Sequence, residues 1–256
     1  MTNTPAMHYS RLLHSGRAVT VVSPHHDDAA LSLGAHISHL AADGVHVTLL
    51  NCFTVTSYAP FASTEAHTVN QVGAIREAED AEFCSRAGPS VSSVSLGMLD
   101  SLLRMGTEDL DCVLTHRPLD DDDVVALEQL RVQLVRRCPA EPVLVPLAIG
   151  SHIDHRLASL AAVLSLRRQI AAFYEDLPYA MRGPAVATDR AVSFCERLIA
   201  EKLTPVTLLP SYSPDSKRNL LEAYRSQLCD EDVALSVQGP VGGERLWIPR
   251  SLLGAS

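Results

Sequence analysis

Short apolar segments alternate with helical patterns along this 256-residue chain. Strand-like apolar runs cover 18–24, 45–55, 90–98, 142–149, 171–174 and 205–209. Helical patterns separate them over 29–43, 70–87, 154–170, 186–202 and 214–229, and one more follows the acidic run 120–123 and ends at Arg137. Strands joined through helices favour right-handed crossovers and parallel pairing. The order predicts an α/β fold, with a Rossmann-like, mostly parallel sheet and helices on both faces.

The chain shows no internal repeat, low-complexity tract or Gly/Ser-rich linker, so the simplest division is a single domain over 1–256. A formal net charge of -9 argues against nucleic acid as a partner, because phosphate backbones attract basic surfaces. The chain has no secretory signal pattern and no apolar run long enough for a membrane span. A cytoplasmic protein without a membrane span is expected. The 6 cysteines form no CxxC pair and are expected to be reduced core residues.

Two polar clusters follow strand-like runs. Residues 25–28 read His-His-Asp-Asp after the apolar run 19–22, and residues 151–155 read Ser-His-Ile-Asp-His after 142–149. In an open parallel sheet, ligands bind in the crevice beyond the carboxyl ends of the strands. Histidine and aspartate are ligands suited to zinc. One metal site shared by both clusters is the leading hypothesis.

A catalytic zinc ion commonly has three protein ligands and one open position. We expect His25, Asp28 and His155 to supply the three ligands, with another divalent metal as the alternative to zinc. Asp27 then lies beside the metal without binding it. It is the predicted general base, which takes a proton from a water molecule activated by the ion.

The second cluster supplies two further predicted roles. His152 is expected to face the substrate carbonyl, where its imidazolium form stabilises the oxyanion and then protonates the leaving amine. Asp154 is expected to hold a histidine ring in orientation without contacting the metal. Ser151 suggests a serine nucleophile as an alternative, but the chain has no G-x-S-x-G turn to present it.

Simpler interpretations stay open for these polar residues. Both clusters are also readable as helix N-caps with incidental histidines, since aspartate caps helices well. His36 and His39 lie three residues apart on a predicted helix and imitate a ligand pair, but we expect ordinary surface or core histidines. The acidic run 120–123 is expected to be a capped, solvated helix start, with a cation site as the alternative.

With both clusters considered together, the chain resembles the LmbE-like, or PIG-L, family of zinc-dependent N-deacetylases. The family motif P-H-x-D-D is matched by residues 24–28, and H-x-D-H is matched by residues 152–155. The resemblance implies zinc held by His25, Asp28 and His155, with Asp27 as base and His152 as oxyanion stabiliser and acid. These roles agree with those expected from the residues themselves.

Further matches extend the resemblance over most of the chain. Residues 76–80 resemble the family's R-x-x-E-D helix, which implies that Arg76 lies near the substrate; a helix ion pair with Asp80 is the alternative. Residues 174–179 and 217–227 resemble late segments of one branch of the family. Two departures mark a divergent member: His26 replaces a proline and Ala29 replaces a glutamate of the common motif.

The predicted function is therefore zinc-dependent removal of an acetyl or other acyl group from an N-acetylated amino sugar or glycoside, in natural-product or glycoconjugate biosynthesis. The partner is a small-molecule N-acetylated glycoside, and the sequence leaves open whether subunits associate. Two alternatives are an amidase acting on a non-sugar amide conjugate and a non-catalytic metal-binding relative. The segment 56–69 is the expected mobile loop at the site, and His67 and Asp100 are candidates for lining the pocket.

Overall fold

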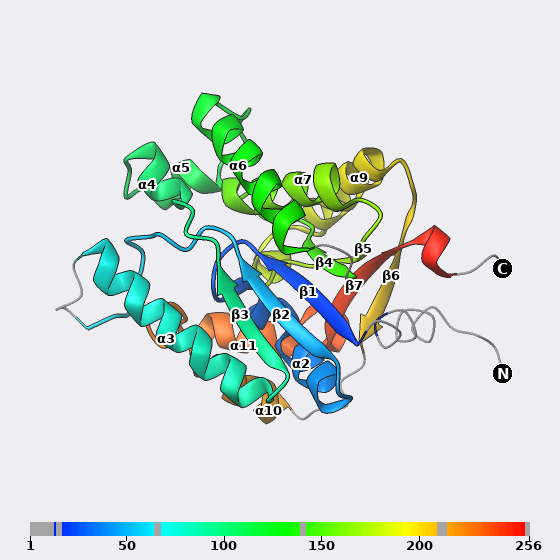
Figure 1. Ribbon diagram of the computed structural model, residues 1–256, viewed down its shortest axis with the longest axis horizontal. Helices are drawn as coiled ribbons and strands as arrows, with labels where there is room; N and C mark the ends of the chain where they lie inside the picture. The colour runs from blue at the N-terminus through cyan, green and yellow to red at the C-terminus, as the bar shows by residue number, and fades with distance from the viewer. Residues whose placement is uncertain (1–12, 14–16, 64–67, 139–141, 209–213, 254–256) are drawn as a thin grey trace.

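Seven strands form one sheet in the order β3-β2-β1-β4-β5-β7-β6 (Figure 1). The computed structural model describes Leu13 and residues 17–63, 68–138, 142–208 and 214–253, so His67 lies outside the described residues. The strands are β1 (Ala18–Ser23), β2 (His46–Asn51), β3 (Val91–Ser95), β4 (Val143–Pro146), β5 (Ile170–Tyr174), β6 (Leu203–Leu208) and β7 (Glu244–Pro249).

Strand pairing is parallel from β3 through β5, and β7 runs antiparallel to both of its neighbours, β5 and β6. The predicted α/β fold with a mostly parallel sheet is confirmed. The local sequence pattern predicts no strand at β7 (Glu244–Pro249). This strand lies between β5 and β6 in the sheet, although three helices, the last of them a short 3₁₀ helix, separate it from β6 along the chain.

Helices cover both faces of the sheet (Figure 1), with α2, α3, α10 and α11 on one face and α6, α7 and α9 on the other. The longer helices are α2 (Asp28–Ala42), α3 (Val69–Ala87), α6 (Asp121–Arg137), α7 (Ile153–Leu166), α9 (Ala185–Ile199), α10 (Pro214–Leu221) and α11 (Asp230–Gln238). The shorter ones are α4 (Ser101–Met105), α5 (Leu110–Leu114), α8 (Tyr179–Arg182), η1 (Pro240–Gly242) and η2 (Arg250–Leu253).

The predicted helix over 214–229 ends early, at Leu221. The chain turns there, and the hydroxyl of Tyr224 donates a hydrogen bond of 2.9 Å to Asp80 on α3. A helix that continued past Leu221 would lack this turn. A tertiary contact therefore accompanies the end of α10, where the local helical pattern alone predicts continuation.

Alternating residues of the central strands enter two separate hydrophobic cores. In β1, Val19 and Val21 pack into the core beneath α2, whereas Val22 belongs to the core beneath α6 and α7. In β5, Phe173 and Tyr174 divide between the two cores in the same way. This is the side-chain period of a strand that is buried on both faces. The helices are therefore held on both sides of one rigid sheet.

The strand order reverses between β1 and β4. From β1 the chain proceeds outward through β2 and β3, then returns to place β4 on the other side of β1. At such a reversal the connections leave the sheet toward opposite faces, which opens a crevice beyond the strand ends. Residues 25–28 follow β1 and residues 151–155 follow β4 by a short loop. The topology therefore brings the two clusters to one crevice.

Among the described residues, no helix combines the length and hydrophobicity that a membrane crossing requires. All six cysteines are free, and four of them are buried, as expected for reduced core residues. Cys112 on α5 is exposed, so the core prediction is wrong for this residue. Cys229 is only partly buried. Cys112 lies on the short helix α5, and Cys229 is the N-cap residue of α11.

Candidate active site

The turn between β1 and α2 folds His25 back onto Asp28. The backbone N–H of His25 donates to Asp28 Oδ2 at 2.8 Å, and His25 Nδ1 lies 3.0 Å from the same oxygen. Asp28 is the first residue of α2, where the positive end of the helix dipole favours a carboxylate. The local sequence therefore places one imidazole nitrogen and one carboxylate oxygen side by side at the end of β1.

His155 approaches the same oxygen from the other cluster. Its Nε2 lies 3.3 Å from Asp28 Oδ2, and its Nδ1 lies 2.7 Å from Oδ1 of Asp176, at the end of β5. The Asp176 carboxylate accepts the Nδ1 proton, so Nε2, which faces Asp28, is the nitrogen that can give up its proton to bind a metal. His155 is fully buried, and its Nε2 makes no hydrogen bond of good geometry. A buried nitrogen without a hydrogen bond, aimed at a carboxylate, is an arrangement suited to a cation.

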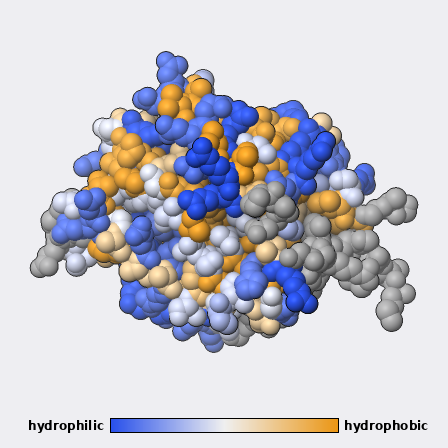
Figure 2. Space-filling view, viewed as in Figure 1, coloured by the Kyte–Doolittle hydropathy of each residue, from blue (hydrophilic) through white to orange (hydrophobic). Residues whose placement is uncertain are grey.

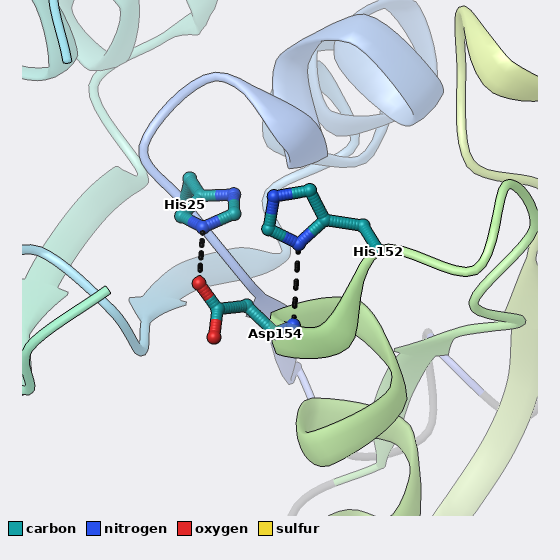
Figure 3. A group of neighbouring side chains, drawn as sticks. All are labelled: His25, His152 and Asp154. Atoms are coloured by element: carbon teal, nitrogen blue, oxygen red, sulfur yellow. Dashed lines mark hydrogen bonds and ion pairs between the residues drawn. The ribbon is translucent and has the colours of Figure 1, made fainter. Parts of the chain in front are cut away.

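Two groups in the described residues bring three candidate ligand atoms within 4.8 Å of one another. One is His25, Asp28 and His155, the set expected from the sequence. The other is His25, His152 and Asp154 (Figure 3). In Figure 3 the Asp154 side chain extends from the first turn of α7 toward the His25 ring, and its Oδ2 lies 3.1 Å from His25 Nε2.

The charges around the first group favour a bound cation. Burial alone lowers the pKa of His25, but hydrogen bonds to Asp154 and Asp28 raise it overall to about 9. Burial also opposes protonation of His155, yet Asp28 and Asp176 hold its pKa well above the usual range. Burial acts to raise the pKa of Asp28, and the two histidines instead bring it well below its ordinary value. The carboxylates therefore stabilise positive charge here.

The donor set fits a divalent metal such as zinc. Each imidazole presents one nitrogen toward Asp28, while its second nitrogen contacts a carboxylate, Asp154 for His25 and Asp176 for His155. Metal-bound histidines commonly have this arrangement, because the outer carboxylate sets the tautomer and the ring direction. Two imidazoles and one carboxylate are also a common ligand set of catalytic zinc.

Asp27 contacts Arg76 instead of capping its own helix. It occupies the N-cap position of α2, but its side chain makes no capping hydrogen bond. Arg76 Nη2 donates to Asp27 Oδ1 at 3.3 Å, and Arg76 Nη1 donates to the carbonyl of Tyr58 at 3.2 Å. Burial and the neighbouring Asp28 raise the pKa of Asp27 despite this guanidinium. The simple capping interpretation of residues 25–28 is therefore not what the structure shows.

His152 caps α7 and lines the crevice at once. Its Nδ1 accepts a hydrogen bond of 3.2 Å from the backbone N–H of Asp154, so the proton of a neutral ring lies on Nε2. Burial lowers the pKa of His152 to about 3, and Asp154 only partly offsets this effect. The imidazolium expected from the sequence is thus disfavoured in the free protein. The neutral ring keeps one N–H to donate.

Helix α3 anchors the surrounding loops through the residues of the R-x-x-E-D match. Besides Arg76, Glu79 accepts hydrogen bonds from the backbone and hydroxyl of Ser226 and from the amide of Gln227. Asp80 accepts from Asn51 Nδ2 at 2.9 Å and from the Tyr224 hydroxyl. The alternative ion pair between Arg76 and Asp80 is not what the structure shows, because Arg76 pairs with Asp27.

A cleft of ≈ 210 Å³ opens above these groups. Its lining includes polar residues of both clusters and Leu102, Leu110 and Leu114 of α4 and α5. Figure 2 shows hydrophobic surface gathered over the region of α4 to α6, where Leu110 and Val125 are exposed. Asp100, a predicted candidate, lines the cleft and caps α4. The cleft can accommodate a ligand with one polar and one apolar side.

The family becomes clear from comparison with known proteins. A model of the PIG-L family, described as GlcNAc-PI de-N-acetylase, matches residues 20–165, which contain both polar clusters and helix α3. The chain belongs to the PIG-L family. The predicted family is therefore confirmed, although the individual roles of the site residues remain predictions.

One curated relative of this PIG-L protein is a 2'-N-acetylparomamine deacetylase of Streptomyces fradiae. It is 30% identical over 190 residues, which are 73% of this chain and 66% of that protein. The chain thus spans just under two thirds of the length of this relative. The family description names a de-N-acetylase, and this relative is a deacetylase. This is the class of enzyme that the sequence predicts.

Solved structures show the same fold. A deacetylase of the A40926 pseudoaglycone has a TM-score of 0.61 at 20% identity, covering 93% of this chain and 98% of that one. A zinc-inhibited form of teicoplanin deacetylase has a TM-score of 0.64 at 20% identity, covering 90% and 97%. The N,N'-diacetylchitobiose deacetylase of Pyrococcus horikoshii has a TM-score of 0.53 at 16% identity, covering 100% and 97%.

Three residues at the site of this PIG-L protein received no role from the sequence. Asp176 lies in the matched segment 174–179, but its contact with His155 depends on how β4 and β5 pair. Arg104 pairs with Asp154 at 2.8 Å. Tyr179 lines the cleft and packs edge-on against His155, and its ring lies against Gly150. Only the strand-end position of Asp176 is a signal readable in sequence.

Other predicted residues lie outside the site. His36 is buried and His39 is exposed on α2, and neither belongs to a candidate metal group of the described residues. Asp120 caps α6 through a capping box with Asp123, so the acidic run is a capped helix start. One part of that prediction is wrong: Asp123 is buried rather than solvated, because two arginines pair with it.

Proposed function

We propose that this PIG-L protein is a metal-dependent N-deacetylase that hydrolyses the acetamide of an N-acetylated amino-sugar glycoside. The single observation that carries the proposal is the convergence of His25, Asp28 and His155 on one another, with His25 and Asp28 lining a cleft. Asp27 and His152 line the same cleft. A cation site with a carboxylate and an imidazole beside it has the parts that amide hydrolysis requires.

His25 Nδ1, Asp28 Oδ2 and His155 Nε2 would hold the metal. Zinc is the ion we propose, because two imidazoles and a carboxylate suit it, and another divalent ion is the alternative. The bound ion would supply Lewis-acid activation of the amide carbonyl and of a water molecule. Proton transfer and stabilisation of the oxyanion are proposed for side chains of the protein itself.

Asp27 is the proposed general base and proton shuttle. Its raised pKa makes it a better proton acceptor than an ordinary exposed aspartate. Arg76 donates to Asp27 Oδ1, which fixes the direction of the carboxylate. Asp27 takes the proton from the attacking water and passes it to the nitrogen of the leaving amine. Arg76 thus acts on the substrate through Asp27.

His152 is the proposed oxyanion donor. Because its Nδ1 accepts the N–H of Asp154, its Nε2–H remains to donate to the carbonyl oxygen as negative charge develops there. Donation from the neutral ring requires no protonated state of His152. Asp154, in turn, holds His25 by its other side, so one short segment serves both the oxyanion and a metal ligand.

An amino-sugar glycoside is the proposed substrate class. We expect the hydroxyl groups of a glycoside to contact the polar residues that line the cleft and its aglycone to contact the leucines of α4 and α5. The named relative is a 2'-N-acetylparomamine deacetylase, and the family description names GlcNAc-PI. These relatives support a sugar acetamide over other amides.

Substitution of Asp27 tests the proposal. We expect Asp27→Asn to lower kcat about 10²–10⁴-fold while metal content stays at the wild-type level, because the base is lost and the ligands are kept. Acetate release from N-acetylated amino-sugar glycosides and metal content are the measurements. Asp121→Asn, on the exposed start of α6, is the matched control and should keep full activity.

The same assay separates the alternatives. Wild-type protein is loaded with zinc, cobalt or manganese at one equivalent and in excess, because a teicoplanin deacetylase is known in a zinc-inhibited form. Release of acyl groups from non-sugar amides but not from glycosides would favour the amidase alternative. Metal uptake with equal background rates for wild type and Asp27→Asn would point to a binding protein without turnover.

A further inference from the structure

Helix α4 contacts both oxygens of the Asp154 carboxylate, Oδ1 through an ion pair and Oδ2 through a hydrogen bond. Arg104 Nη2 lies 2.8 Å from Asp154 Oδ1, and the backbone N–H of Ser101 donates to Oδ2 at 2.9 Å. Oδ2 is also the oxygen that lies 3.1 Å from His25 Nε2. Asp154 is fully buried, so these contacts leave its carboxylate little freedom. Its direction toward His25 is set from α4, not only from its own helix α7.

Both terminal nitrogens of Arg104 have partners, whereas its buried Nε makes no hydrogen bond. Its Nη1 donates to the carbonyl of Leu99 at 2.8 Å, and its Nη2 lies 3.3 Å from Asp123 Oδ1. The guanidinium lies over the ring of Phe53, 5.0 Å from the centroid. Arg117 Nη1 neutralises the far side of Asp123 at 2.6 Å. The planar, five-donor guanidinium matches this set of partners in a way an ammonium cannot.

This pairing distinguishes the two candidate metal groups. Asp154 belongs to the group with His25 and His152, but the guanidinium of Arg104 already compensates its charge. A carboxylate so compensated is a poor ligand for a cation and a good acceptor for an imidazole N–H. The ion pairs found for Asp28 among the described residues are with His25 and His155. Asp28 is thus the carboxylate left for the metal.

We propose that Arg104 is a positioning residue of the metal site. By fixing Asp154 as the acceptor for His25 Nε2–H, it aims His25 Nδ1 at Asp28 and His155. The inference rests on the proposed function, because it requires His25 to be a metal ligand. Arg104 also connects the lining of the cleft with the proposed ligand His25, since Ser101 and Leu102 of the same helix line the cleft.

Cobalt binding to the metal-free protein tests this role. Cobalt is titrated into wild type, Arg104→Gln and Arg104→Lys in competition with a chelator, and the visible absorption spectrum is recorded. We expect Arg104→Gln to bind cobalt about 10–100-fold more weakly, the loss typical when a group that orients a metal-bound histidine is removed. Its absorption bands should shift as well. Arg104→Lys keeps the charge and should recover part of the affinity.

Arg117→Gln is the matched control. It removes a guanidinium from the same buried carboxylate, Asp123, but the contacts of Arg117 do not include Asp154. Its cobalt affinity and spectrum should equal those of wild type, even where urea unfolding shows a loss of stability. If Arg104 only stabilised the fold, loss of either arginine would change cobalt binding to the same extent. Equal changes of cobalt affinity and absorption spectrum in Arg117→Gln and Arg104→Gln would therefore overturn the proposal.

Wild-type cobalt affinity and an unchanged spectrum in folded Arg104→Gln would also overturn it. Should Arg104→Gln not fold, Arg104→Lys decides, since an ammonium cannot hold Leu99, Asp123 and Asp154 together in the same geometry. An unchanged spectrum and affinity in Arg104→Lys would then refute the role. If the wild-type protein took up no cobalt, the proposed function itself would be refuted. If the wild type took up cobalt and the Arg104 variants bound it equally well, only the role of Arg104 would be refuted.

Discussion

At the residue scale, each histidine of the candidate ligand set is held by a carboxylate behind it. His25 has Asp154 and His155 has Asp176, at 3.1 Å and 2.7 Å. Such partners fix the tautomer, so that the opposite nitrogen has a lone pair to offer. Asp176 is itself anchored, because its Oδ2 accepts the backbone N–H of Ile149 at 3.0 Å. The two imidazoles are therefore already oriented in the absence of substrate.

Asp176→Asn should weaken metal binding by about 10–100-fold, because an amide is a weaker acceptor than a carboxylate for the Nδ1 proton of His155. Competition titration with a chromophoric chelator measures the effect. The control is Asp43→Asn, which alters a histidine–aspartate pair at the exposed end of α2, where His39 Nε2 lies 3.5 Å from Asp43. Equal metal affinity in Asp176→Asn and wild type would contradict the role of Asp176.

At the element scale, one buried ion pair joins three elements that lie behind the site. Lys217 of α10 lies 2.8 Å from Glu244 of β7, and both side chains are almost wholly buried. Glu244 also accepts the backbone N–H groups of Ala35 and His36, in the middle of α2. The helix that begins at Asp28 is thereby fixed to the antiparallel strand. Such a pair is costly to break, because one charge remains without its partner.

Lys217→Met should lower the free energy of unfolding by about 3–5 kcal/mol, since it leaves Glu244 buried and unpaired. The only other lysine of the chain, Lys202, is the control. Its side chain is 75% exposed beside Glu196. Lys202→Met should change stability by about 1 kcal/mol or less, as for surface ion pairs. Urea unfolding of both variants measures the free energy of unfolding. Equal losses in the two variants would show that burial of the ion pair does not determine its contribution to stability.

At the scale of the whole molecule, the candidate metal site joins segments that are far apart in the chain, but the sheet does not depend on it. His25 follows β1 and His155 follows β4, and these strands pair directly. Two extensive cores on the faces of the sheet stabilise that pairing independently. A metal bound to the folded state alone adds stability through mass action. Its removal should therefore lower stability without unfolding the protein.

Chelation should lower the Tm of metal-loaded wild type by about 5–10 °C. This follows from about 2.7 kcal/mol of binding stabilisation at a free metal concentration a hundred times Kd, and from the usual sensitivity of a chain of this size. Far-UV circular dichroism should remain unchanged at 25 °C. Asp28→Asn, which lacks the shared ligand oxygen, should show no response to the chelator. A wild-type Tm that is equally insensitive would argue against a bound ion.

Much of the fold and of the candidate site is readable from local patterns. The strand and helix periods and the polar clusters after β1 and β4 predict the parallel sheet and place His25, Asp28 and His155 together. Exceptions arise where a distant contact outweighs the local pattern. Helix α10 ends at Leu221, where the turn brings Tyr224 to Asp80, and Asp123 is buried against arginines although it belongs to an acidic run. The chemical roles of the site residues remain predictions.

The amino-acid sequence by itself determines which groups lie at the strand ends, because the side-chain period and the end of a strand are set by neighbouring residues. It determines the family for the same reason, since the motifs are contiguous. Only the tertiary structure decides that Asp176 orients His155, that Arg104 compensates Asp154, and that β7 enters the sheet between β5 and β6. These contacts join residues far apart in the chain, and their geometry follows from how strands and helices pack, which no local pattern encodes.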